Sequence, residues 1–112
     1  MFLSNDPWVG AAHQMDVTLL TPVFWDGKLF CWITNVLHQY DVGGITPGSF
    51  CPNARDAFDE GILIPPVKIV EHGELRRDIE AVYLRASRKP YLVALDLRAQ
   101  IALVLQEPII LP

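Results

Sequence analysis

The stretch DVTLLTPVFWDGKLFCWITNVLH, residues 16–38, decides the fold. Residues 16–25 and 28–38 are rich in Val, Thr, Leu, Ile and aromatic side chains, which favour β-strands. Between them, Asp26 and Gly27 can supply the positive φ angles that a type I′ turn requires at both central positions. The stretch therefore predicts an antiparallel β-hairpin closed by a two-residue turn.

Outside the hairpin, the sequence predicts loops followed by helices, and so a mixed α/β fold of the α+β kind. Residues 1–15 and 42–52 contain Gly, Pro and turn-forming pairs, so we expect irregular structure there. Apolar side chains repeat at helical spacing within residues 74–86 and 90–106, which predicts two C-terminal helices. Two shorter elements are expected between these segments: a helix at 53–60 that ends at Gly61, and a strand at 67–70.

Length and composition fit one compact domain, residues 1–112. Apolar residues make up 51% of the chain and charged residues 20%, which permits a core and argues against disorder. The net charge of −4 disfavours a nucleic-acid partner, because phosphate binding relies on clustered Lys and Arg. No apolar run approaches the roughly 20 residues that span a bilayer, and nothing resembles a secretion signal. We therefore expect a reduced, cytoplasmic protein that binds neither nucleic acid nor membrane.

Two copies of one short pattern, His-x-x-Asp, flank the hairpin. They are His13-Gln-Met-Asp16 and His38-Gln-Tyr-Asp41. Imidazole and carboxylate ligands together suit divalent ions such as Mn, Fe and Zn. A single copy carries little information because both residue types are common on protein surfaces, whereas two copies are informative if the fold joins them. The alternative is that His38 is a core histidine and that the aspartates cap turns.

The register of the hairpin brings both copies to its open end. With Trp25 opposite Lys28, a regular ladder places Leu37 opposite Asp16 and leaves His38 one position further along. Directly opposed Cβ atoms lie roughly 5 Å apart, within reach of one ion. Because side chains alternate across a strand, this ladder puts the two histidines on one face and the two aspartates on the other. A site that uses all four ligands therefore requires a bulge or a bend.

Longer runs of the sequence resemble a known family. The run NDPWVGAAHQMDVTLLTPVFWDGKLFCWITNVLHQYDVGGITPGSF and the later pieces EGILIPPVKIVEHGELRRDI and LDLRAQIA are similar, in the same order, to hydantoinase B/oxoprolinase proteins. The resemblance covers residues 2–102. Within the family, HQMDVTLL, LFCWITNVLHQYD and FCPNARDAFDE look most like the large (alpha) subunit of acetone carboxylase.

The resemblance implies one subunit of an ATP-dependent, metal-dependent enzyme. Acetone carboxylases join acetone and bicarbonate to give acetoacetate. Their large subunit carries a manganese ion, a hydantoinase A-type partner subunit handles ATP, and a small subunit binds zinc. Carried onto this sequence, the positions that match the metal site are His13, Asp16, His38 and Asp41. There, Mn²⁺ or another divalent ion is expected to act as a Lewis acid that polarises a carbonyl of a small-molecule substrate.

The size of the family's members leaves the reaction open. They run to several hundred residues, so the resemblance implies a partial domain, a fragment of a larger fold that is expected to be inactive alone. ATP-dependent hydrolysis of a cyclic amide, such as a hydantoin or 5-oxoproline, is an alternative to carboxylation. A third possibility is an inactive remnant that binds only a metal or a partner. A small zinc-type subunit encoded nearby would favour the carboxylase.

Overall fold

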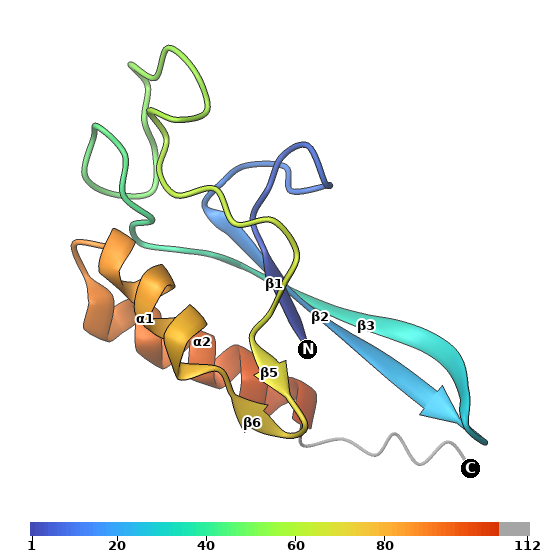
Figure 1. Cartoon of the computed structure of the whole chain (residues 1–112). Coiled ribbons are helices and arrows are strands. Elements are labelled where there is room, and N and C mark those ends of the chain that lie inside the picture. The colour runs from blue at the N-terminus through green and yellow to red at the C-terminus, as the bar shows by residue number, and fades with distance from the viewer. Residues whose placement is uncertain (106–112) are drawn as a thin grey trace.

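A four-stranded antiparallel sheet covered on one face by two helices forms the body of the protein (Figure 1). The computed structural model describes residues 1–105. In chain order the elements are β1 (Phe2–Ser4), β2 (Asp16–Trp25), β3 (Lys28–His38), β4 (Val67–Lys68), β5 (Val70–Glu71), β6 (Glu74–Leu75), α1 (Arg77–Ala86) and α2 (Pro90–Leu105). The main sheet has the order β3-β2-β1-β4, and β5 pairs with β6. This arrangement confirms the mixed α/β fold class, with an antiparallel hairpin and C-terminal helices.

The hairpin of β2 and β3 has the predicted turn. Asp26 and Gly27 have φ angles of 48° and 71°, and Trp25 pairs with Lys28. Positive φ at both central residues is the signature of the type I′ turn, whose twist matches that of the strands. The hairpin is the longest strand pair in the described residues and extends past the body of the protein (Figure 1).

A β-bulge next to the turn changes the register of the whole hairpin. The pairing of β3 with β2 passes from Leu29 directly to Cys31, so Phe30 is an extra residue. From there to the open end, every residue of β3 is shifted by one position relative to a regular ladder. Asp16 therefore pairs with His38. The regular ladder predicted that Leu37 lies opposite Asp16, and this prediction is wrong by one residue.

The N-terminal segment is more ordered than the sequence predicts. Residues 2–4, expected to be irregular, form β1, which lies between β2 and β4. Asn5 then ends the strand and holds the chain in place: its Nδ2 donates to the carbonyls of Gln14 and Ile62, both at 2.8 Å, and its Oδ1 accepts the N–H of Ile64 at 2.7 Å. The fully buried Asn5 therefore ties the loop before β2 to a segment almost 60 residues later.

Residues 53–60 form turns, so the helix expected there is wrong. The Oδ1 of Asp56 accepts the backbone N–H groups of Phe58 at 2.9 Å and Asp59 at 3.3 Å. The guanidinium of Arg55 in turn donates to the Asp59 carboxylate at 2.8 Å. Short polar side chains that bond to nearby backbone offer the chain an alternative to the helical ladder. The local sequence has helical composition, but these side chains satisfy the backbone in another way.

The C-terminal half matches the expectation more closely. The strand expected at 67–70 is divided into β4 and β5 around Ile69. The helix expected from residue 74 begins at Arg77, because β5 and β6 first form a second tight hairpin through His72 and Gly73, whose φ angles are 52° and 80°. The helix expected at 90–106 is α2, although its last expected residue lies outside the described residues.

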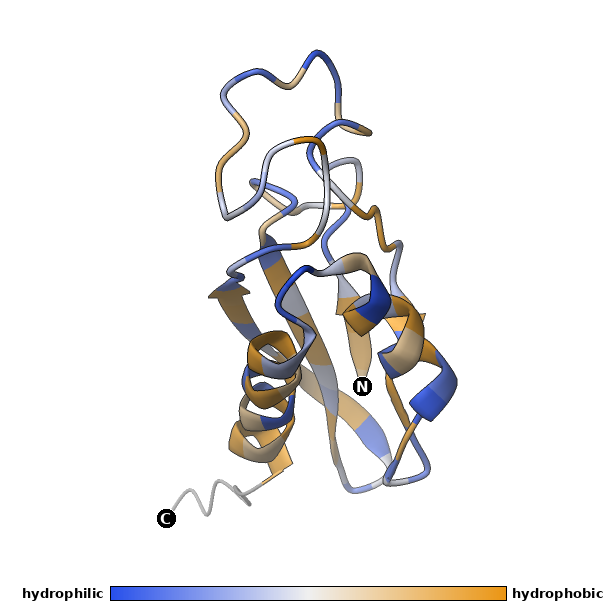
Figure 2. Cartoon of the chain, turned by 90° about the vertical axis from the view of Figure 1, so that its left-hand side faces the viewer, coloured by the Kyte–Doolittle hydropathy of each residue, from blue (hydrophilic) through white to orange (hydrophobic). Residues whose placement is uncertain are grey.

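The core lies between one face of the sheet and the helices. Alternate side chains of β2 and β3 point towards α2, whose Gln100 donates through Nε2 to the carbonyl of Val17 at 3.2 Å. Figure 2 shows apolar residues along both helices and strands. The main core residues are Leu3, Met15, Val17, Leu19, Val42, Ile64, Ile69, Tyr83, Val93 and Leu97. Across residues 1–105, no helix is long and apolar enough to cross a membrane.

Candidate metal centre

Three of the four predicted ligands meet at the open end of the hairpin. The Nδ1 atom of His13 lies 2.8 Å from Oδ2 of Asp16, and the Nδ1 atom of His38 lies 2.8 Å from Oδ1 of the same carboxylate. The bulge makes this possible, because it places Asp16 and His38 opposite each other on one face of the sheet. His13 comes from the loop before β2, three residues upstream of Asp16. The first His-x-x-Asp copy and the histidine of the second thus form one cluster.

The carboxylate of Asp16 is held in its ionised form. Partial burial raises the pKa of this group, but the hydrogen bonds from His38 and His13 outweigh burial, and the pKa lies below its ordinary value of 3.8. An ionised carboxylate only accepts hydrogen bonds, so both imidazoles donate to it from Nδ1. Both imidazole rings remain open to solvent, with side-chain exposures of 73% for His13 and 51% for His38. A ligand arriving from solvent can therefore reach the cluster.

Contacts with the loops before β2 and after β3 help to position the cluster. The backbone N–H of Gln39 donates to the carbonyl of Met15 at 2.8 Å, which continues the pairing of the strands just beyond Asp16. The Nε2 atom of His38 lies 3.3 Å from the carbonyl oxygen of Ser49. The loop before β2 and the loop after β3 lie at the same end of the sheet in Figure 1. His38 is therefore positioned by tertiary contacts as well as by its own strand.

Asp41, the fourth predicted ligand, is bonded elsewhere. It is buried, and its two oxygens accept four hydrogen bonds. Oδ1 accepts the backbone N–H groups of Gly43 at 2.8 Å and Arg88 at 3.2 Å, and Oδ2 accepts the N–H of Gly48 at 3.0 Å and Nη1 of Arg88 at 2.9 Å. Burial raises the pKa of Asp41, but these donors outweigh it and lower the pKa below its ordinary value. Asp41 fixes the loop that follows His38.

Arg88 is the residue of this network that the sequence did not reveal. Arg88 lies in the turn between α1 and α2, and its guanidinium also donates to the carbonyls of Gly43 and Gly44. The only signal in the sequence was the basic pair Arg88-Lys89 before the helix-starting Pro90, and the partner of Arg88 lies 47 positions away.

The donor set fits a divalent ion in its chemistry. Two imidazoles and one carboxylate suit Mn²⁺, Fe²⁺ and Zn²⁺ alike. Neighbouring ligands on an ion with bonds near 2.1 Å are separated by about 3 Å, close to the 2.8 Å spacings in this cluster. In the structure, the two imidazoles are hydrogen-bonded to the carboxylate of Asp16. Within residues 1–105, no group of three or more His, Cys, Asp or Glu is arranged to hold a metal. Binding therefore requires a metal to displace the protons between imidazole and carboxylate.

Comparison with known proteins identifies the family. The family model described as hydantoinase B/oxoprolinase matches residues 1–106. The acetophenone carboxylase delta subunit of Aromatoleum aromaticum is 33% identical over 101 residues, which are 89% of this chain and 15% of that protein. The matched relatives are therefore several times longer than this chain.

Two solved structures share the fold. The ATP-dependent caprolactamase from Pseudomonas jessenii superimposes with a TM-score of 0.83 and 34% identity, over 90% of this chain and 17% of that one. Acetone carboxylase in its nucleotide-free form gives a TM-score of 0.84 and 33% identity, over 90% of this chain and 13% of that one. With a family match over nearly its whole length and relatives at about one-third identity, the chain belongs to the hydantoinase B/oxoprolinase family.

Proposed function

We propose that His13, Asp16 and His38 bind a divalent metal ion, and that the chain contributes this centre to an ATP-dependent enzyme acting on a carbonyl compound. The observation that carries the proposal is the convergence of both histidines on one ionised, partly exposed carboxylate. Manganese is the ion we expect, with another divalent metal as the alternative. When bound, the ion supplies Lewis-acid polarisation of a substrate oxygen.

The protein's own residues have separate roles in this proposal. Asp16 provides the negative charge and the fixed point on which both imidazoles are aligned. Asp41, with Arg88, holds the loop after β3, whose Ser49 carbonyl lies beside the outer nitrogen of His38. Asp41 is thus a positioning residue, because both of its oxygens are already bonded. Groups that orient metal ligands commonly affect metal affinity although they do not touch the ion.

The reaction proposed first is the carboxylation of acetone with bicarbonate to acetoacetate. In this proposal a hydantoinase A-type subunit binds ATP, a small subunit binds zinc, and neither function resides in this chain. Hydrolysis of a cyclic amide is the second candidate. It is supported by the caprolactamase structure, which matches as well as the acetone carboxylase structure does, with TM-scores of 0.83 and 0.84. Both reactions begin with a polarised carbonyl group, so the proposed role of the metal centre is the same in each.

Metal content tests the centre. The 112-residue chain is purified, exposed to Mn²⁺, passed through a desalting column and analysed by elemental mass spectrometry. We expect about one ion per wild-type chain and at least a tenfold loss in the His38→Ala variant. His72→Ala is the matched control, because His72 lies in the β5–β6 turn, outside the cluster. Equal metal content in the two variants would contradict the proposed centre.

A further inference from the structure

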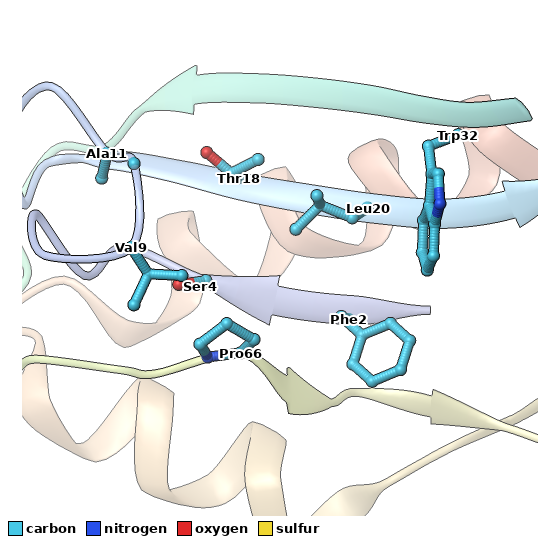
Figure 3. Close-up of a pocket in the computed structure, with 9 residues that line it drawn as sticks. Phe2, Ser4, Val9, Ala11, Thr18, Leu20, Trp32 and Pro66 are labelled. Carbon is cyan, nitrogen blue, oxygen red and sulfur yellow. The ribbon is translucent and has the colours of Figure 1, made fainter.

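The outer edge of β3 is a long strand edge that no other strand of residues 1–105 covers. β3 stands at one end of the sheet order β3-β2-β1-β4, whereas the opposite edge is formed by the much shorter β4. Figure 3 shows the strand that carries Trp32 as the outermost strand, with the helices behind the sheet. An exposed strand edge offers backbone N–H and C=O groups to another polypeptide. The edge of β3 is therefore a candidate interaction surface.

The hydrogen-bond pattern of the hairpin identifies which backbone groups point outward. At the open end, the N–H of Gln39 donates to the carbonyl of Met15 at 2.8 Å. In an antiparallel ladder, hydrogen-bonded and non-hydrogen-bonded pairs alternate, so the odd-numbered residues in the range 31–37 bond to β2. Pro22, which has no N–H, accordingly lies opposite an even-numbered residue, Trp32. The outward-pointing backbone groups are those of Trp32, Thr34 and Val36.

The side chains along this edge lack the features that commonly keep strand edges apart. Between Lys28 and His38 the strand reads LFCWITNVL, with no charged residue and no proline. Natural edge strands often carry such residues, which prevent pairing with another copy. Each chain has a net charge of −4, but none of that charge lies in this stretch. Trp32 and Val36 are 49% and 57% exposed, so the edge presents apolar surface beside its backbone groups.

The free and regular part of the edge has Thr34 at its midpoint. It ends at the bulge at Phe30 on one side and at His38 of the metal cluster on the other. A two-fold axis at Thr34 places this residue opposite its own copy, and Trp32 opposite Val36 of the second copy. Three residue pairs then exchange about six backbone hydrogen bonds. Thr–Thr and aromatic–β-branched pairs are among those that stabilise antiparallel sheets, so the edge is complementary to itself.

We propose that two copies of this chain pair through the outer edges of β3, antiparallel and in this register, to form one continuous sheet with four strands from each copy. A two-fold contact uses the same surface on both copies, as this self-complementary edge does. One strand from each copy gives a contact smaller than permanent dimer interfaces, so the pairing is reversible and depends on concentration. The proposal does not depend on the metal centre, because the paired residues lie outside it.

Sedimentation equilibrium of the full 112-residue chain tests the pairing. Chain concentrations from about 1 µM to about 1 mM cover the affinities expected of a small, reversible contact. We expect the average mass to rise from that of a monomer towards that of a dimer without larger species, because a two-fold contact is closed. A chain that stays monomeric over the whole range, or that grows into open-ended oligomers, would overturn the proposal.

Hydrogen exchange of backbone amides identifies the surface that pairs. The N–H groups of Ile33 and Asn35 bond within the hairpin, so they should exchange slowly at every chain concentration. The N–H groups of Trp32, Thr34 and Val36 point outward, and they should exchange about tenfold or more slowly in the dimer than in the monomer. A dimer with unchanged exchange at these three positions would overturn the proposal and place the contact on another surface, such as the hairpin tip.

Two charge variants at the two-fold axis test the register. Thr34→Lys and Thr34→Glu each place like charges opposite each other, so each variant alone should dimerise about tenfold or more weakly than the wild type. Mixed in equal amounts, the two variants should dimerise with each other, because the opposed charges then attract. Trp25→Lys is the matched control: it adds the same charge at the exposed hairpin tip and should change dimerisation less than about twofold. Failure of the mixture to pair, or an equal loss in Trp25→Lys, would overturn the proposed contact.

Discussion

The two His-x-x-Asp motifs have the same pattern and different roles. In the first motif, Asp16 is partly exposed and bonds only to imidazoles among side-chain donors. In the second, Asp41 is buried and bonds to three backbone N–H groups and one guanidinium. His38 belongs to the second motif by sequence and to the first by contact. A short motif therefore predicts which groups are available, while register and burial decide which of them meet.

This difference shows that one carboxylate can serve mainly to stabilise the fold, while another of the same motif remains able to bind a ligand. The oxygens of Asp41 are occupied by groups that cannot leave without exposing unpaired backbone donors. The partners of Asp16 are solvent-exposed imidazoles that can give up their hydrogen bonds to the carboxylate when an ion arrives. We therefore expect substitutions of Asp41 to affect mainly stability, and substitutions of Asp16 to affect mainly metal binding.

The largest effect on stability is expected for Asp41→Ala. This change leaves the Gly43 and Gly48 N–H groups and the Arg88 guanidinium without their acceptor, which costs about 3 kcal/mol of unfolding free energy. Urea denaturation followed by circular dichroism measures it. Asp16→Ala is the matched control at the twin position, and we expect it to cost less than about 1 kcal/mol because its partners are exposed. Equal losses would remove the distinction between the motifs.

A smaller loss of stability is expected from a substitution in the turn between β2 and β3. Gly27→Val forces a β-branched residue to φ 71°, where it is strained, and should cost about 1–2 kcal/mol. An added Cβ at this position meets no atom within 4 Å, so the cost comes from the backbone alone. Gly27→Asn is the control, because Asn tolerates positive φ, and it should cost under about 0.5 kcal/mol. A neutral Gly27→Val substitution would mean that the turn does not hold the hairpin register.

Acid titration should show how Asp41 couples folding to protonation. The pKa of Asp41 is lowered in the folded protein, so its contribution to stability is fully present above the unfolded value of 3.8 and is lost as pH falls through the folded pKa. Asp41→Asn should therefore flatten the fall in stability between pH 5 and pH 3, measured by urea unfolding at several pH values. Asp78, whose pKa is lowered to about 2, should keep part of the slope in this variant. An unchanged slope would mean that Asp41 does not couple folding to protonation.

The sequence predicted the hairpin because its signals are local. Alternating β-formers and an Asp-Gly turn act within a few residues of one another, and the turn and both strands were correct. The bulge at Phe30 could not be read in the same way, because nothing in the strand's own sequence marks where an extra residue is accommodated. The three residues of β1 were missed for a related reason: a strand so short has no periodicity and exists through its neighbours.

The candidate site followed the same rule. The four candidate ligands were visible as two motifs, and the position of both motifs at the open end of the hairpin followed from the turn. The opposition of Asp16 and His38 required the bulge, which a regular ladder lacks. The hydrogen bonds of Asp41 depend on Arg88, which lies 47 residues later in the turn between α1 and α2. Contacts at long sequence separation thus decided which carboxylate stays available.

The most direct test is the Mn²⁺ affinity of two matched variants, Asp16→Asn and Asp41→Asn. Both substitutions remove one charge and keep the shape of the side chain, and the signal of free Mn²⁺ in electron paramagnetic resonance reports binding. We predict that Asp16→Asn raises the dissociation constant about 100-fold or more, while Asp41→Asn, measured where it is folded, raises it less than about 10-fold. Equal effects, or a larger effect from Asp41→Asn in folded protein, would contradict the assignment of the metal centre to His13, Asp16 and His38.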